Sequence, residues 1–208
     1  MSCLAGPQSG KGVIIEDDYD SEFRLTGKPV PSLQSIDVQE KVIYMNTFTK
    51  TLSSTVRISY MVLPKHLAER FLEQLSFYSC TVSNFEQYVL AAFIKEGYFE
   101  KHINRMRKYY HEKRDLLLKQ IGDSGLADCC SISEEDAGVH FLMEVNTELS
   151  DDEVCTALER EGIKVSSVAQ YYMENAGKKE HIFVMNYSSL EEANMKETIR
   201  KLEKLFVK

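Results

Sequence analysis

A single lysine lies within a hydroxyl-rich segment, residues 46–54, that follows an apolar run. The segment reads NTFTKTLSS, its lysine is Lys50, and Arg57 lies seven residues after that lysine. Hydroxyls, an amine and a guanidinium at the end of a strand suit an anionic ligand such as a phosphate group. A polar loop with a solvated lysine is the simpler interpretation, and the pattern alone slightly favours it.

An acidic cluster, residues 16–20, follows a short apolar run at residues 13–15. The run VII is typical of a fully buried strand, and the cluster EDDYD is too acidic to continue that strand inside a core. In open α/β sheets the ligand-binding groups lie at the carboxyl ends of the strands. The cluster is therefore a second candidate for a ligand site.

Apolar periodicity along the chain predicts strands that alternate with helices, and hence an α/β fold. The helix expected at 98–120 carries many charged residues, which we interpret as a solvated face. Capping boxes at 150–153 and 189–192 are expected to open two later helices. Strands are expected at 13–15, 42–45, 58–63, 139–145, 163–168 and 181–185, and helices at 65–79, 83–96, 98–120 and 150–161, with a terminal helix after 189–192.

The composition excludes several classes of protein. The 208 residues include 25 Lys and Arg against 32 Asp and Glu, which gives a net charge of −7 and makes nucleic-acid binding by this chain unfavourable. No apolar run approaches the roughly 20 residues of a membrane span, and the N-terminus lacks the apolar core of a signal peptide. The five cysteines and five histidines show no metal-ligand spacing. We expect a cytoplasmic globular protein with free thiols, no metal site and no membrane contact.

Several motifs resemble the aminotransferase-like domain of MocR/PdxR-type regulators, which belong to the GntR family of transcription factors. The strings are IIEDDYDSEFR at 14–24, VIYMNTFTKTLSSTVRISYMVLP at 42–64, SNFEQYVLAAFIKEGYFEKHINRMRKYYHEKRDLL at 83–117 and AGVHFLMEV at 137–145. They cover nearly all of the chain from residue 13 on and occur in the family's order. The resemblance implies a fold-type-I transferase-like α/β fold that binds pyridoxal 5′-phosphate (PLP).

The resemblance also implies a role for six residues. Lys50 matches the lysine whose amine forms a Schiff base with the PLP aldehyde, which requires a lowered amine pKa. Asp17 matches the aspartate that pairs with the protonated pyridine nitrogen and so maintains the ring as an electron sink. Tyr19 matches the tyrosine that hydrogen-bonds the phenolic oxygen. The residues that fall where hydroxyls and a guanidinium hold the phosphate are Thr47, Thr49 and Arg57.

Each of these residues has a plain structural alternative. Asp17 can cap a turn, Tyr19 can fill a core, and Arg57 can form a surface ion pair. The two threonines can satisfy loop backbone. Together, at the family's positions, these alternatives are less convincing than the cofactor roles. For the other acidic residues of the cluster the structural alternative is preferred, because the resemblance gives no cofactor contact to Glu16, Asp18 or Asp20.

Two departures from the family pattern affect the expected function. Val184 occupies the position of the arginine that grips the substrate carboxylate, although Lys178, Lys179 or His181 can substitute for it. The family also has a winged-helix DNA-binding domain and a first half of the PLP domain, and the sequence begins after both. We therefore expect DNA contact only through a domain absent from this chain, and weak PLP binding by this chain alone.

The Gly, Ser and Pro content of residues 1–12 predicts a flexible start. The resemblance implies the second half of the PLP-binding large domain with its connecting helix at 13–120, and a small C-terminal domain at 121–208. We expect a homodimer that senses an amine or amino-acid effector by exchange at Lys50, with a domain closure that alters DNA binding. One alternative is a fragment of a class I/II aminotransferase acting on amino acids. A second alternative is a degenerate domain without PLP that serves dimerisation.

Overall fold

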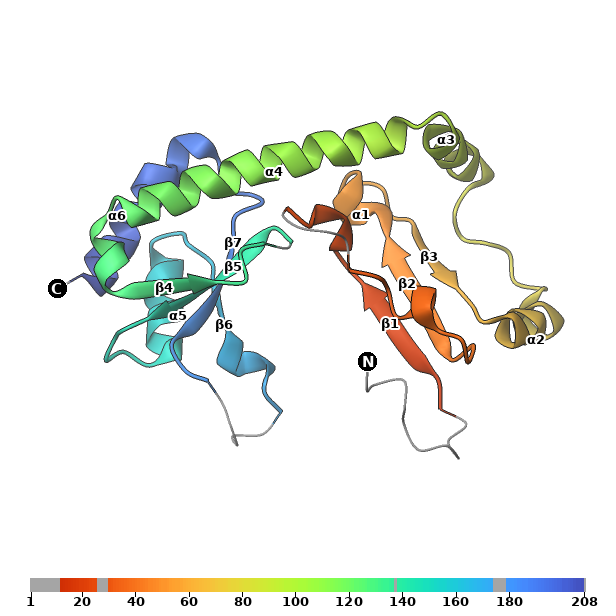
Figure 1. Cartoon of the computed structure of the whole chain (residues 1–208), viewed down its shortest axis with the longest axis horizontal. Helices are drawn as coiled ribbons and strands as arrows, with labels where there is room; N and C mark the ends of the chain where they lie inside the picture. Colours follow the sequence, from red (N-terminus) through yellow and green to blue (C-terminus); the bar gives the residue numbers. More distant parts are fainter. Residues whose placement is uncertain (1–11, 26–29, 137, 174–178, 208) are drawn as a thin grey trace. The chain divides into compact units, whose positions relative to one another are not determined.

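The computed structural model describes residues 12–25, 30–136, 138–173 and 179–207 and shows both strands and helices (Figure 1). The chain forms two compact units, and each is described by itself. The first unit comprises Met1–Glu22 and Lys28–Ile103, and the second comprises Phe23–Gly27 and Asn104–Lys208. In the part of the chain described, no helix combines the length and the apolar character needed to cross a membrane.

The first unit contains a three-stranded sheet in the order β1-β2-β3. β1 (Ile14–Asp18) is parallel to β2 (Val42–Thr47), and β3 (Ser59–Val62) is antiparallel to β2. The carboxyl ends of β1 and β2 therefore lie at the same edge of the sheet, as the sequence motifs require. The helices of this unit are α1 (Phe48–Thr51), α2 (Lys65–Leu75), α3 (Asn84–Lys95) and the start of α4 (Tyr98–Gly122), with a 3-10 turn, η3, at Gln34–Ile36.

β1 differs from the sequence prediction in length and in burial. It continues through the acidic residues to Asp18, and its side chains alternate between exposed and half-buried positions. Ile15 is exposed, so the strand is not fully buried as predicted. The strand extends through the acidic residues because its backbone pairs with β2 as far as Asp18, opposite Asn46, and carboxylates on one face find hydrogen-bond donors. Glu16 accepts the backbone N–H groups of Leu33 and Gln34 at 2.7 and 2.9 Å.

The second unit contains a four-stranded antiparallel sheet in the order β4-β5-β7-β6 (Figure 1). Its core includes Phe141, Met143 and Phe183 from the sheet, packed with side chains of the helices. The strands are β4 (Cys130–Ser133), β5 (His140–Val145), β6 (Ser166–Ser167) and β7 (Ile182–Asn186), and the helices are α5 (Asp151–Arg160) and α6 (Met195–Phe206). β4 was not predicted, and β6 is shorter than predicted.

Of the two predicted capping boxes, only the first opens a helix. Ser150 and Glu153 form a reciprocal capping box at α5, with the Ser150 N–H donating to Glu153 Oε2 at 2.8 Å. The second prediction is wrong, because α6 begins at Met195, after a 3-10 turn, with no side-chain cap. The chain leaves β7 through a turn around buried Tyr187, whose backbone carbonyl accepts the Leu190 N–H, and this turn delays the helix.

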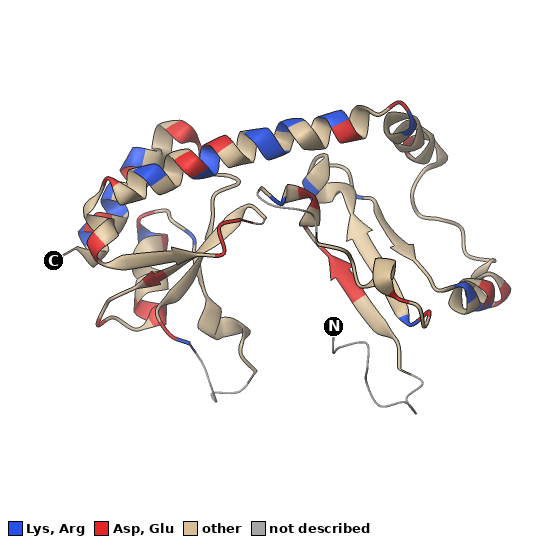
Figure 2. Ribbon diagram, in the orientation of Figure 1, with Lys and Arg blue, Asp and Glu red and all other residues tan. Residues whose placement is uncertain are grey.

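Charged residues mark the whole length of α4 in Figure 2, yet they do not form one solvated face. Lys113 and Arg114 are buried, with 3% and 6% of their surfaces exposed, which corrects the prediction. The Lys113 amine donates to the Ser188 carbonyl at 3.0 Å, and the Arg114 guanidinium reaches the Glu135 carbonyl at 3.2 Å. Long cationic side chains can bury their stems while their ends find oxygen partners.

This arrangement predicts that two lysines of α4 contribute differently to the free energy of unfolding. We expect Lys113→Met to lower the free energy of unfolding by about 1–3 kcal/mol, because it removes the donor to the Ser188 carbonyl. Lys108, whose side chain is 78% exposed, is the matched control, and Lys108→Met should change that free energy by less than about 0.5 kcal/mol. Urea unfolding of both variants measures the difference. Equal effects would mean that the buried amine contributes nothing specific.

Candidate functional site

Lys50 lies on a short helical turn at the carboxyl end of β2. Thr47 ends the strand and caps α1, because its hydroxyl oxygen accepts the Thr49 N–H at 3.3 Å. The Phe48 N–H donates to the Ile58 carbonyl at 2.9 Å, which fixes the start of the turn. The sequence predicted a loop here. The structure instead gives Lys50 a defined backbone position.

The two threonines predicted to hold a phosphate form contacts within this turn. Thr47 Oγ1 lies 3.2 Å from the Ile58 carbonyl, and Thr49 Oγ1 donates to the Val56 carbonyl at 3.0 Å. The two hydroxyl oxygens are 3.0 Å apart. In this structure they tie α1 to the segment before β3, so their phosphate role stays a prediction.

The structure brings the amine of Lys50 to the ring of Tyr19. Nζ lies 5.3 Å from the ring centroid, within the range of a cation–π contact. Tyr19 directly follows β1, and Lys50 lies three residues after β2. The parallel pairing of these strands is what places the two residues at one edge of the sheet.

Asp17 lies in β1 on the face opposite that of Glu16 and Asp18. It is exposed, it pairs in register with Met45, and no hydrogen bond or ion pair joins it to another described residue. Asp18, in contrast, accepts the Tyr44 hydroxyl at 2.7 Å. The structure thus leaves the Asp17 carboxylate available to a ligand, while Glu16 and Asp18 have structural partners.

Behind the site, a polar network joins β1 and β2 on the face of Asp18. Asn46 is 4% exposed and donates to Glu22 Oε1 at 3.1 Å and to the Tyr44 hydroxyl at 2.9 Å. Burial raises the pKa of Glu22 above its ordinary value, and the nearby Asp18 and Asp20 carboxylates add to this effect. Burial likewise raises the pKa of Tyr44. Sequence reasoning missed this network, although the alternation along β2 places Tyr44 and Asn46 on one face.

No contact among the described residues joins the remaining predicted residues to Lys50. Arg57 is exposed between α1 and β3, and it forms no ion pair with another described residue. Val184 lies on β7 in the second unit, in register with Leu142 and Ser166. Of its possible substitutes, His181 lies with Nδ1 3.5 Å from Asp151 Oδ1, and Lys178 lies outside the described residues.

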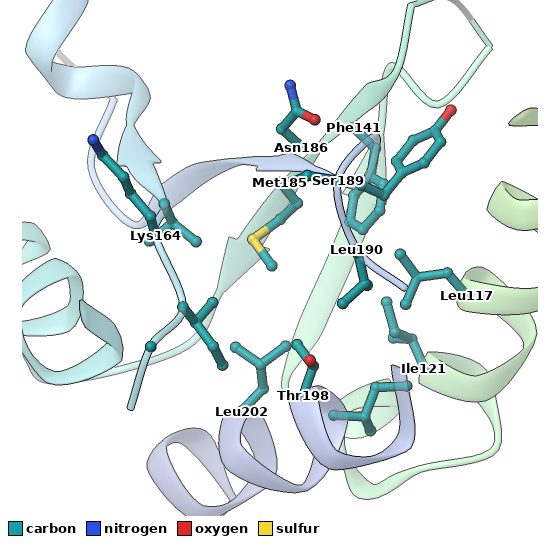
Figure 3. Close-up of a pocket in the computed structure, with 15 residues that line it drawn as sticks. Leu117, Ile121, Phe141, Lys164, Met185, Asn186, Ser189, Leu190, Thr198 and Leu202 are labelled. Carbon is teal, nitrogen blue, oxygen red and sulfur yellow. The ribbon is translucent and has the colours of Figure 1, made fainter. Parts of the chain in front are cut away.

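A cavity of about 290 Å³ in the second unit is a different kind of site. Figure 3 shows Met185 and Thr198 directed into it, whereas the nitrogen of Lys164 points away. Its other walls are mainly aliphatic, so it offers neither an amine nor a carboxylate to a ligand. Among the described residues, no group of three or more His, Cys, Asp and Glu side chains is placed to hold a metal ion.

Comparison with known proteins shows which family and fold the chain resembles. Residues 18–202 match the family model described as "Aminotransferase class I and II". A solved archaeal alanine:glyoxylate aminotransferase superposes with a TM-score of 0.77 at 25% identity, over 93% of this chain and 47% of that one.

Two curated relatives are transcriptional regulators. The chain is 40% identical over 203 residues to the uncharacterized HTH-type transcriptional regulator YdeL of Bacillus subtilis (strain 168), covering 98% of this chain and 43% of the relative. It is 35% identical over 194 residues to the probable rhizopine catabolism regulatory protein MocR of Rhizobium meliloti, covering 93% of this chain and 39% of the relative. The chain thus spans less than half the length of these relatives.

Proposed function

Because the chain belongs to the class I and II aminotransferase family, we propose that it is the effector-sensing, PLP-binding part of a MocR-type transcriptional regulator. The resemblance to MocR-type regulators and the predicted fold-type-I transferase-like fold are both confirmed. PLP is the cofactor that the family and its structural neighbours imply. The regulatory activity, the effector and the partners of the whole protein are part of the proposal.

The groups around Lys50 fit PLP. When bound, PLP supplies an aldehyde that takes up amines reversibly and a cationic ring that withdraws electrons. The Lys50 amine suits attachment to the aldehyde, and the available Asp17 carboxylate suits a protonated ring nitrogen. The Tyr19 phenol adds a hydrogen-bond donor beside the amine. The single observation that carries the proposal is the Lys50 amine 5.3 Å from the Tyr19 ring, at the edge where β1 and β2 end.

An effector that carries an amine would compete with Lys50 for the aldehyde, and its binding would shift the protein toward one conformation. Val184 and its register partners Leu142 and Ser166 present no cation to a carboxylate. This favours an effector recognised through its amine rather than through a carboxylate held at β7. We further propose that the protein is a homodimer and contacts DNA through a domain other than this chain.

The test uses the complete protein that the gene encodes, loaded with PLP. The DNA is taken from the region upstream of that gene. A series of amines and amino acids is added, and the DNA affinity is measured by fluorescence anisotropy. We expect at least one amine to change the affinity by about fivefold or more, and only when PLP is bound.

The alternatives give different results in the same preparation. Transfer of amino groups at about 1–1,000 per second, without any change in DNA affinity, would identify an aminotransferase instead. A protein that takes up no PLP, even in excess, would leave only the dimerisation role.

A further inference from the structure

The start of α4 contacts the short helix that carries Lys50. Nε2 of His102 lies 2.9 Å from the carbonyl oxygen of Thr51, which is 51 positions earlier in the chain. Three residues before His102, the Phe99 ring packs edge-on against Phe48, with 5.8 Å between the ring centroids. Residues three apart lie on one face of a helix. One face of α4 therefore meets α1 on both sides of Lys50.

The contact of His102 fills a gap in the hydrogen bonding of α1. The last carbonyls of a helix have no partner within it, and Thr51 is the last residue of α1. Because a carbonyl oxygen only accepts, His102 Nε2 carries the hydrogen of this bond. α1 is only four residues long, and at its end the Leu52 N–H donates to the Phe48 carbonyl at 2.9 Å. The His102 donor thus adds a restraint at the end of the turn, whereas the bonds of Thr47, Phe48 and Thr49 hold its start.

Thr51 is the residue directly after Lys50, and it is 1% exposed. Holding its carbonyl therefore restricts the peptide unit between Thr51 and Leu52, one residue beyond Lys50, and through it the backbone from which the lysine side chain leaves. The amine of that side chain lies 5.3 Å from the centroid of the Tyr19 ring. A turn without this restraint would let the amine sample other directions, and the fraction of molecules ready to take up a ligand would fall.

We propose that His102 is a positioning residue, which fixes the end of α1 so that the amine of Lys50 faces Tyr19. The part of this inference that concerns PLP rests on the proposed function. The part that concerns the turn does not, and it is measured without the cofactor.

Three substitutions in the protein as its gene encodes it separate positioning from general stability. His102→Gln keeps an N–H donor, whereas His102→Phe keeps a planar ring and removes the donor. His66→Phe is the control, because His66 is an exposed histidine of the same unit, 3.7 Å from Glu40.

Amide hydrogen exchange of the peptide 48–52 is measured first, without PLP. We expect exchange to be about fivefold to tenfold faster in His102→Phe and close to wild type in His102→Gln and His66→Phe. The second measurement is PLP attachment to Lys50, followed by visible absorbance. The apparent affinity should fall about tenfold in His102→Phe and be restored in His102→Gln.

Two results would overturn the inference: a folded His102→Phe that behaves as wild type in exchange and attachment, or a His102→Gln that exchanges as fast as His102→Phe. If His102→Phe does not fold, the comparison of His102→Gln with wild type decides whether His102 positions the turn. A His102→Gln variant that does not fold, or that attaches PLP less well than wild type, would count against positioning. Wild-type protein that attaches no PLP would reject the proposed function, while the exchange measurement would still judge the turn.

Discussion

Replacement of Lys50 by alanine is expected to abolish the visible absorbance of PLP attached to the protein. The amine of Lys50 is the group that lies beside Tyr19 at the end of β2, and the segment 46–54 contains no other lysine. Without that amine the cofactor has no attachment point at this site, so the loss should be complete. The measurement is an absorbance spectrum of the protein as its gene encodes it, after incubation with excess PLP and removal of the unbound cofactor.

Lys41→Ala is the matched control for this experiment. Lys41 immediately precedes β2, at the opposite end of the strand from Lys50, and its substitution should leave the absorbance unchanged. Thermal unfolding of both variants shows whether either has lost the fold. A folded Lys50→Ala variant with wild-type absorbance would reject Lys50 as the attachment point.

The second large effect is expected from Asp17→Asn. A carboxylate paired with a protonated ring nitrogen forms a charge-assisted hydrogen bond, worth about 1.5–3 kcal/mol. Its neutral amide replacement should therefore weaken PLP binding about tenfold to a hundredfold. Because the Asp17 side chain is exposed and joined to no other described residue, the free energy of unfolding without PLP should change by less than about 0.5 kcal/mol.

Asp18→Asn is the matched control, because Asp18 is the next residue in the chain and lies on the opposite face of the sheet from Asp17. Asp18 accepts the Tyr44 and Ser21 hydroxyls, each at 2.7 Å, so this variant should lose about 1 kcal/mol of stability. Its affinity for PLP, measured by spectroscopic titration, should stay within about twofold of wild type. If the two variants weaken PLP binding equally, the assignment of Asp17 to the ring nitrogen is wrong.

The sequence predicted the longer elements well because their periodicity is local. The apolar spacing from residue 98 onward predicts α4, and Gly97 has the positive φ of +73° that ends α3 before it. Burial of Lys113 and Arg114 was not predictable in this way. Their oxygen partners, the Ser188 and Glu135 carbonyls, come from segments distant in the sequence. The late start of α6 follows a turn at buried Tyr187, whose carbonyl accepts the Leu190 N–H, and the local capping signal at 189–192 did not indicate this turn.

For the candidate site, residue types and family motifs predicted which side chains to examine, and strand pairing explains why Tyr19 and Lys50 meet. The helical turn at Phe48–Thr51 was missed because the hydroxyls that suggested a loop instead bond to the Val56 and Ile58 carbonyls. The contact between His102 and Thr51 joins segments 51 positions apart, so no local pattern indicates it.

Reduction with borohydride followed by peptide mass spectrometry identifies the amine to which PLP is attached. The reagent makes the link between PLP and an amine permanent, and the mass of each peptide then identifies the modified lysine. We expect one phosphopyridoxyl group per chain, on the peptide that contains Lys50. A modification spread over surface lysines, or concentrated on a lysine other than Lys50, would contradict this expectation.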